Sequence, residues 1–97
     1  MTFPTIHTNG TGSQTLLDGY VSAFLAVRGA IDDIRRIEFN ARDYYPQGDQ
    51  AWPAARNEMQ ERIRKLDAVA DELEAIADHI QTLVAEREDR KASHGQN

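Results

Sequence analysis

The sequence of 97 residues contains no cysteine and few basic residues. The absence of cysteine excludes disulfide bonds and thiolate-based metal or redox sites. Eleven Lys and Arg face 16 Asp and Glu, so the net charge is −5. This balance argues against a surface for nucleic acid or anionic membranes, both of which favour a basic face. Long apolar runs are also missing, and residues 1–12 lack the basic start and apolar block of a signal peptide, so we expect a cytoplasmic protein.

A chain of this length is expected to form one domain, close to the lower limit for independent folding. Without disulfides, such a small domain commonly depends on oligomerisation. Composition and periodicity divide the chain into an extended arm (1–12), a first helix (13–40), a loop (41–50), a second helix (51–90) and a frayed tail (91–97).

The first helix is indicated by apolar residues spaced alternately three and four apart, as in a coiled-coil seam: Leu17, Tyr20, Phe24, Val27, Ile31 and Ile34. Candidate N-caps are Thr11, Ser13 and Thr15, and Thr15 with Asp18 imitates a capping box. Asn40 is a plausible helix-ending residue, and the following Pro46 and Gly48 do not favour a helix.

The second helix carries the clearest pattern, a heptad of Met59, Leu66, Leu73 and Ile80 with further apolar residues between them. Asp49 is its candidate N-cap, and Pro53 is tolerated because it lies in the first turn. The apolar stripes on both helices are wider than one neighbouring helix can cover. We therefore predict an all-α fold, an antiparallel two-helix hairpin with an extended N-terminal arm, which assembles with copies of itself into a helical bundle.

Residues that could support catalysis are sparse. No histidine has a second ligand at metal-binding spacing, and no phosphate-binding loop or nucleophile motif is present. The pairs Glu58/Glu61 and Asp71/Glu74 resemble fragments of the acidic motifs with which helical nucleotide pyrophosphatases hold magnesium. Because exposed helices commonly show the same spacing, we expect no enzyme activity and no cofactor.

The loop offers the most informative candidate site. Two adjacent tyrosines, Tyr44 and Tyr45, lie between Arg42-Asp43 and Gln47, and Trp52 follows shortly after. Aromatic rings beside a cation and an amide can stack on a flat ligand and hydrogen-bond to its edge. Alternatively, the rings plug the open end of the bundle, and the polar side chains cap helix ends. Both alternatives are compatible if each uses a different face of the loop.

The arm is the second candidate site. His7 precedes the turn dipeptide Asn9-Gly10, and both His7 and Asn9 are candidate binding residues. Phe3 and Ile6 can pack over a hydrophobic seam. In one hairpin the arm and the loop lie at opposite ends. An antiparallel neighbour would bring them together, so a composite site at a subunit interface is a further possibility.

The arm segment Ile6-His7-Thr8-Asn9-Gly10-Thr11 and the loop segment Arg42-Asp43-Tyr44-Tyr45-Pro46-Gln47-Gly48 resemble motifs of a group of small phage and prophage proteins. This chain has Ala41 where that group usually has Gly, and Gln14 where a Pro often opens the first helix. The resemblance implies a viral accessory protein.

Small acidic helical phage proteins often counter host defence, which is an argument by analogy. The sequence-level hypothesis is thus a binding protein that blocks a host protein complex or sequesters a small nucleotide at a subunit interface. A structural or assembly protein of the virion is the alternative, and a magnesium-dependent pyrophosphatase is a further one.

Overall fold

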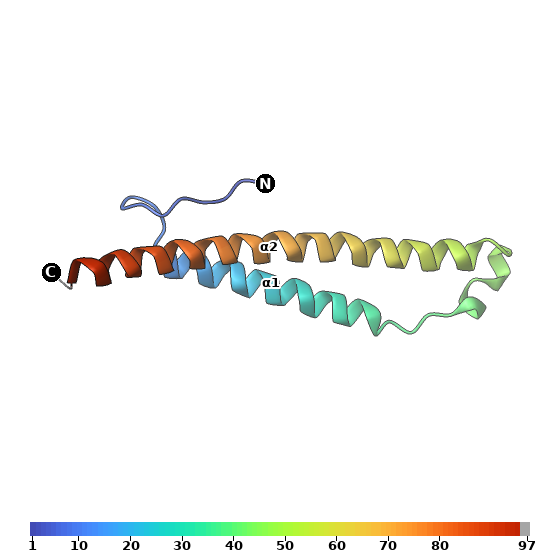
Figure 1. Ribbon diagram of the computed structural model, residues 1–97. Coiled ribbons are helices and arrows are strands. Elements are labelled where there is room, and N and C mark those ends of the chain that lie inside the picture. The colour runs from blue at the N-terminus through green and yellow to red at the C-terminus, as the bar shows by residue number, and fades with distance from the viewer. Residues whose placement is uncertain (96–97) are drawn as a thin grey trace.

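The computed structural model describes the backbone of residues 1–95 and the side chains of residues 1–90. Two helices, α1 (Ser13–Arg35) and α2 (Ala51–Gly95), run antiparallel as a long hairpin (Figure 1). Two short 3₁₀ turns, η1 (Ala41–Asp43) and η2 (Tyr45–Gln47), lie in the connection. Residues 1–95 contain no strand, so the all-α prediction and the helix-on-helix packing are confirmed.

The α1 helix begins where predicted, but its cap differs from the prediction. Gly12 occupies the N-cap, and its carbonyl accepts the first helical hydrogen bond from the Leu16 N–H at 3.0 Å. No side chain caps this end, so the N-cap roles expected for Thr11, Ser13 and Thr15 are wrong. Asp18 instead accepts a hydrogen bond from the Gln14 side chain at 2.7 Å.

The α1 helix also ends at Arg35, earlier than the predicted end at residue 40. The Arg36 N–H is shared between the carbonyls of Asp32 (3.2 Å) and Asp33 (3.1 Å), and the Ile37 N–H bonds to Ile34 at 3.1 Å. These bonds tighten the last turn towards 3₁₀ geometry and satisfy the terminal carbonyls. The chain is then free to leave the helix before Phe39.

The α2 helix is longer than predicted and remains helical to Gly95. Its first helical bond runs from the Ala54 N–H to the Gln50 carbonyl at 3.2 Å, so Gln50 rather than Asp49 occupies the capping position. Pro53 lies in the first turn, where its missing N–H breaks no hydrogen bond. Residues 91–95 of the expected frayed tail continue the helix, and residues 96–97 lie outside the described residues.

The core is a narrow seam between the two helices. The buried side chains of the described part are Ile31 of α1 and Ala70, Ile76, Ala77 and Ile80 of α2. The predicted heptad positions are all at least half-buried, as expected for a coiled-coil-like contact. Arg28 links the two helices at one edge of the seam, where its guanidinium lies 2.8 Å from Asp67 and 5.6 Å from the centre of the Phe24 ring.

Apolar side chains outside this seam are exposed. Leu25 is 61% exposed, Ile37 51% and Val69 43%. The molecule measures 76 × 22 × 20 Å, with a radius of gyration of 21.2 Å. A compact chain of this length has a radius of gyration of about 12.5 Å. One hairpin therefore covers only part of the stripes that its helices carry.

Candidate functional site

The connection between the helices is built around three aromatic rings. The Phe39 ring lies 5.2 Å from Trp52 and 6.4 Å from Tyr44, both edge-on, and Tyr44 lies 5.9 Å from Trp52. These separations are typical of favourable aromatic pairs. The Arg56 guanidinium lies 6.0 Å from the Trp52 ring centre. This cluster closes the end of the hairpin where α2 begins.

A local hydrogen bond and a glycine conformation shape the loop that carries the cluster. The Asn40 N–H donates to the Asp43 carboxylate at 2.9 Å, which fixes the start of η1. Asn40 thus begins a 3₁₀ turn instead of ending α1. Gly48 adopts a φ of 104°, a left-handed conformation that favours glycine, and so lets the chain turn into α2.

The two tyrosines of the loop have different environments. Tyr44 is half-buried within the aromatic cluster, whereas Tyr45 is 70% exposed. The side chains of Arg42 and Gln47 are exposed beside Tyr45 in the chain. Tyr44 and Trp52 therefore pack together at the end of the hairpin, whereas the neighbouring Tyr45 faces solvent.

The arm lies along the other half of the hairpin, beside α2 (Figure 1). The Phe3 ring packs on the His79 ring at 4.8 Å, and His79 Nε2 lies 3.2 Å from the Pro4 carbonyl oxygen. His7 and Asn9 are exposed near the arm's turn. One chain thus keeps the arm and loop candidates apart, and a composite site requires a second copy.

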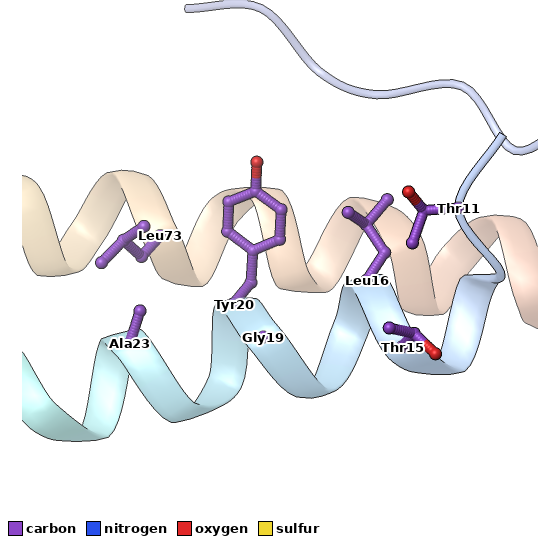
Figure 2. Close-up of a pocket in the computed structure, with 7 residues that line it drawn as sticks. All are labelled: Thr11, Thr15, Leu16, Gly19, Tyr20, Ala23 and Leu73. Atoms are coloured by element: carbon purple, nitrogen blue, oxygen red, sulfur yellow. The ribbon is translucent and has the colours of Figure 1, made fainter.

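An apolar groove lies between the helices near the start of α1 (Figure 2). Its volume is about 230 Å³, and it is lined by Thr11, Thr15, Leu16, Gly19, Tyr20, Ala23 and Leu73. Gly19 leaves open space here, because a Cβ at this position would meet nothing within 4 Å. The groove is a recess in a mostly apolar face.

One member of each acidic pair considered for magnesium, Glu61 and Asp71, lies beside an arginine. Arg64 donates two hydrogen bonds to Glu61, at 2.6 and 3.0 Å, and these hold the pKa of that carboxyl below its usual value. Asp71 lies 3.9 Å from the Arg28 guanidinium. Among the described side chains, no three Asp, Glu or His residues converge as metal ligands would. The same part of the chain has no helix that is both long and apolar enough to cross a membrane.

Sequence reasoning missed Phe39 as part of the site and His79 as the anchor of the arm. Phe39 lies five residues after Ile34 and so falls outside the three-and-four spacing of the first helix, but spacing alone does not indicate its aromatic partners. The contact between His79 and the arm gives no signal in the sequence, because its partner Pro4 is 75 positions away. Comparisons with protein-family models, curated proteins and solved structures give no match. The function of these surfaces must therefore be inferred from their own chemistry.

Proposed function

We propose that this protein is a phage-encoded accessory protein that acts stoichiometrically, by binding, in the cytoplasm of the host cell. Its role is to counter host defence, either by sequestering a small nucleotide at an interface between its own copies or by blocking a host protein complex. The phage assignment is supported by the arm and loop motifs. The counter-defence role is an analogy with other small acidic helical phage proteins.

The observation that carries the proposal is the exposure of Tyr45, 70% of whose surface faces solvent. Its neighbour Tyr44 is held between Phe39 and Trp52, so the loop that presents Tyr45 is anchored at its base. An anchored aromatic loses little conformational freedom on stacking against a flat ligand. Such stacking contributes about 1–3 kcal/mol per base.

Self-association is the second part of the proposal, and surface area supports it. The chain exposes 7330 Å². A compact monomer of 10.9 kDa exposes roughly 5,600 Å². The excess of roughly 1,700 Å² per chain matches what one subunit of an obligate dimer buries, about 1,000–2,500 Å². We infer that the groove around Gly19 and the exposed Val69 contact another copy in a helical bundle.

An antiparallel neighbour would place the loop of one copy near the arm of the next. The composite site would then combine Tyr45, Arg42 and Gln47 with His7 and Asn9 of another copy. This arrangement accounts for two specific motifs at opposite ends of one hairpin.

Native mass spectrometry of the protein purified from infected cells tests both parts of the proposal. We expect an oligomer that carries a bound nucleotide-sized mass, and we expect Tyr45→Ala to lose that mass while keeping the oligomer. Tyr45→Phe, which retains the ring, is the matched control and should keep the ligand. If a host protein instead co-purifies with the unchanged protein and with Tyr45→Phe, but not with Tyr45→Ala, the result would favour the blocking mechanism.

Two outcomes would contradict the proposal. Detection of only a ligand-free monomer of 10.9 kDa would refute the proposed self-association. Full anti-defence activity of Tyr45→Ala would show that the binding site does not lie in the loop. Recovery of the protein in purified virions, with no effect of Tyr45→Ala on host defence, would favour the structural alternative.

A further inference from the structure

The arm forms one wall of a pocket against the last third of α2. Phe3 and Pro4 hold the start of the arm on His79, through a ring contact at 4.8 Å and a polar contact at 3.2 Å. The arm then continues along α2 towards its C-terminus before turning into α1 (Figure 1). Its position over α2 is thus set by contacts upstream of the pocket.

The turn at the end of the arm also shapes the pocket. The Gly10 N–H bonds to the His7 carbonyl at 3.1 Å, closing the turn. A Cβ at Gly10 would lie only 2.9 Å from Nε2 of His7, so the imidazole packs directly on the glycine. The arm motif therefore has a physical explanation, because glycine permits the close approach of the His7 ring.

The pocket has a volume of about 370 Å³, within the range of small-molecule sites. Thr5, His7 and Thr8 line it from the arm, and Leu83, Arg87 and Arg90 line it from α2. Arg87 and Arg90 are three residues apart and so lie on the same face of the helix. Residues with hydroxyl and imidazole groups thus line the cavity from the arm, and two arginines line it from α2.

The charge of this pocket is opposite to that of the chain. Two arginines and one carboxylate, Glu86, line it, whereas the whole chain has a net charge of −5. Within residues 1–90, the ion pairs use Arg28, Arg36 and Arg64, and none uses Arg87 or Arg90. The pocket thus gathers positive charge in an otherwise acidic protein.

We propose that this pocket binds the phosphate group of a small phosphorylated molecule of about mononucleotide size. A phosphate dianion accepts several hydrogen bonds, and arginine forks donate to it in pairs. Arg87 and Arg90 provide these donors from α2, and the hydroxyls of Thr5 and Thr8 provide donors from the arm. Glu86, which also lines the pocket, accepts a hydrogen bond from a sugar hydroxyl, which favours a nucleotide over inorganic phosphate.

This inference rests on the proposed function only where it names a nucleotide, because the pocket is complete within one chain. Tyr45 lies at the other end of the hairpin and can reach a ligand held here only from a second copy. The loop and the pocket can therefore be tested separately.

Calorimetric titration of the purified chain with adenosine 5′-monophosphate and with inorganic phosphate tests the pocket. We expect Arg87→Gln to weaken binding of the nucleotide at least about tenfold, because a charge-assisted hydrogen bond is lost. Arg62→Gln is the matched control: it removes the same charge from an exposed position of α2 outside the pocket. It should change the affinity less than about twofold. Circular dichroism should show unchanged helicity in both variants, since both positions are exposed.

Each other result overturns part of the proposal. No heat of binding with either probe at millimolar concentration would refute the pocket, as would equal weakening by Arg87→Gln and Arg62→Gln. Binding of phosphate as tight as that of the nucleotide would refute the role of Glu86. If Tyr45→Ala alone abolishes nucleotide binding and Arg87→Gln leaves it unchanged, the pocket inference fails and the proposed loop function stands. If Arg87→Gln weakens binding and Tyr45→Ala affects neither binding nor anti-defence activity, the pocket stands and the loop proposal fails.

Discussion

Truncation of the two adjacent tyrosines should separate the plug of the hairpin from its proposed binding surface. Tyr44 is half-buried and packs against Phe39 and Trp52, whereas Tyr45 is 70% exposed. Burial of half of a tyrosine side chain of about 200 Å² contributes about 2.5 kcal/mol. Two aromatic pairs add about 0.5–1.5 kcal/mol each. Tyr44→Ala should therefore lower the free energy of unfolding by roughly 3.5–5.5 kcal/mol.

The same arithmetic limits the effect of Tyr45→Ala. Less than a third of the Tyr45 surface is buried, so its removal costs at most about 1.5 kcal/mol, and less because unfolded chains are not fully extended. Urea unfolding followed by circular dichroism measures both variants at one protein concentration, which matters if unfolding is coupled to dissociation. Tyr44→Phe, which retains the aromatic ring, is the control. Its free energy of unfolding should be close to that of the unchanged protein.

Tyr44→Ala should have the larger effect on stability, whereas Tyr45→Ala should have the larger effect on binding. Tyr45→Ala should weaken ligand or partner binding by roughly 1–3 kcal/mol at full helicity, whereas Tyr44→Ala should lose activity only as far as it unfolds. Equal destabilisation by both substitutions would refute the division between plug and surface. So would normal binding by Tyr45→Ala.

Three further substitutions test the hairpin itself. Leu73→Asp places a charge without a partner at the seam and should abolish both assembly and helicity, so a folded monomer with unchanged melting would contradict the seam. Gly29→Ala should stabilise α1 by about 0.5–1 kcal/mol in thermal melts, because a Cβ there meets nothing within 4 Å. Arg28→Ala should cost only about 0.5–1 kcal/mol, since its pair with Asp67 is partly exposed, and the loss should shrink in high salt.

The helical hairpin could be predicted from the sequence because its heptad repeats are long and regular. The end of α1 could not. Ile37 follows Ile34 at helical spacing, so the periodicity continues past Arg35 although the helix does not. Phe39 gains two aromatic neighbours in the connection, contacts that depend on where Trp52 lies in space. Tertiary packing thus overrides the local pattern, as is common at helix ends.

The end of α2, in contrast, lies beyond the predicted one. The polar residues after Glu86 were expected to fray from residue 91, yet the helix continues to Gly95. Between Pro53 and Gly95 the sequence contains neither glycine nor proline, and Glu, Arg and Ala all favour helix. Polarity therefore indicated the exposure of residues 86–90 correctly but said little about where the helix stops.

The candidate sites were only partly predictable. The aromatic loop stood out by composition, but two adjacent tyrosines give no sequence signal for which one is buried. The pocket on α2 was missed because Arg87 and Arg90 belong to a segment typical of a solvated helix. Its second wall comes from the arm, which meets α2 through Phe3 and His79, residues far apart in sequence.

The distribution of features along the hairpin argues for separate assembly and binding regions. The groove around Gly19 and the exposed Val69 flank the seam, whereas Tyr45 and the pocket beside Arg87 lie towards opposite ends of the molecule. A purely structural bundle would gain little from an exposed tyrosine on an anchored loop. A ligand held at one end of a single hairpin cannot reach the other end, because the chain is 76 Å long. Only assembly would bring both ends to one ligand, so a change that breaks the assembly should also abolish binding at the composite site. Gly19→Leu, which fills the groove, should therefore abolish both assembly and binding at the composite site while the helices remain folded. Tyr45→Ala should abolish binding at the composite site but leave assembly intact.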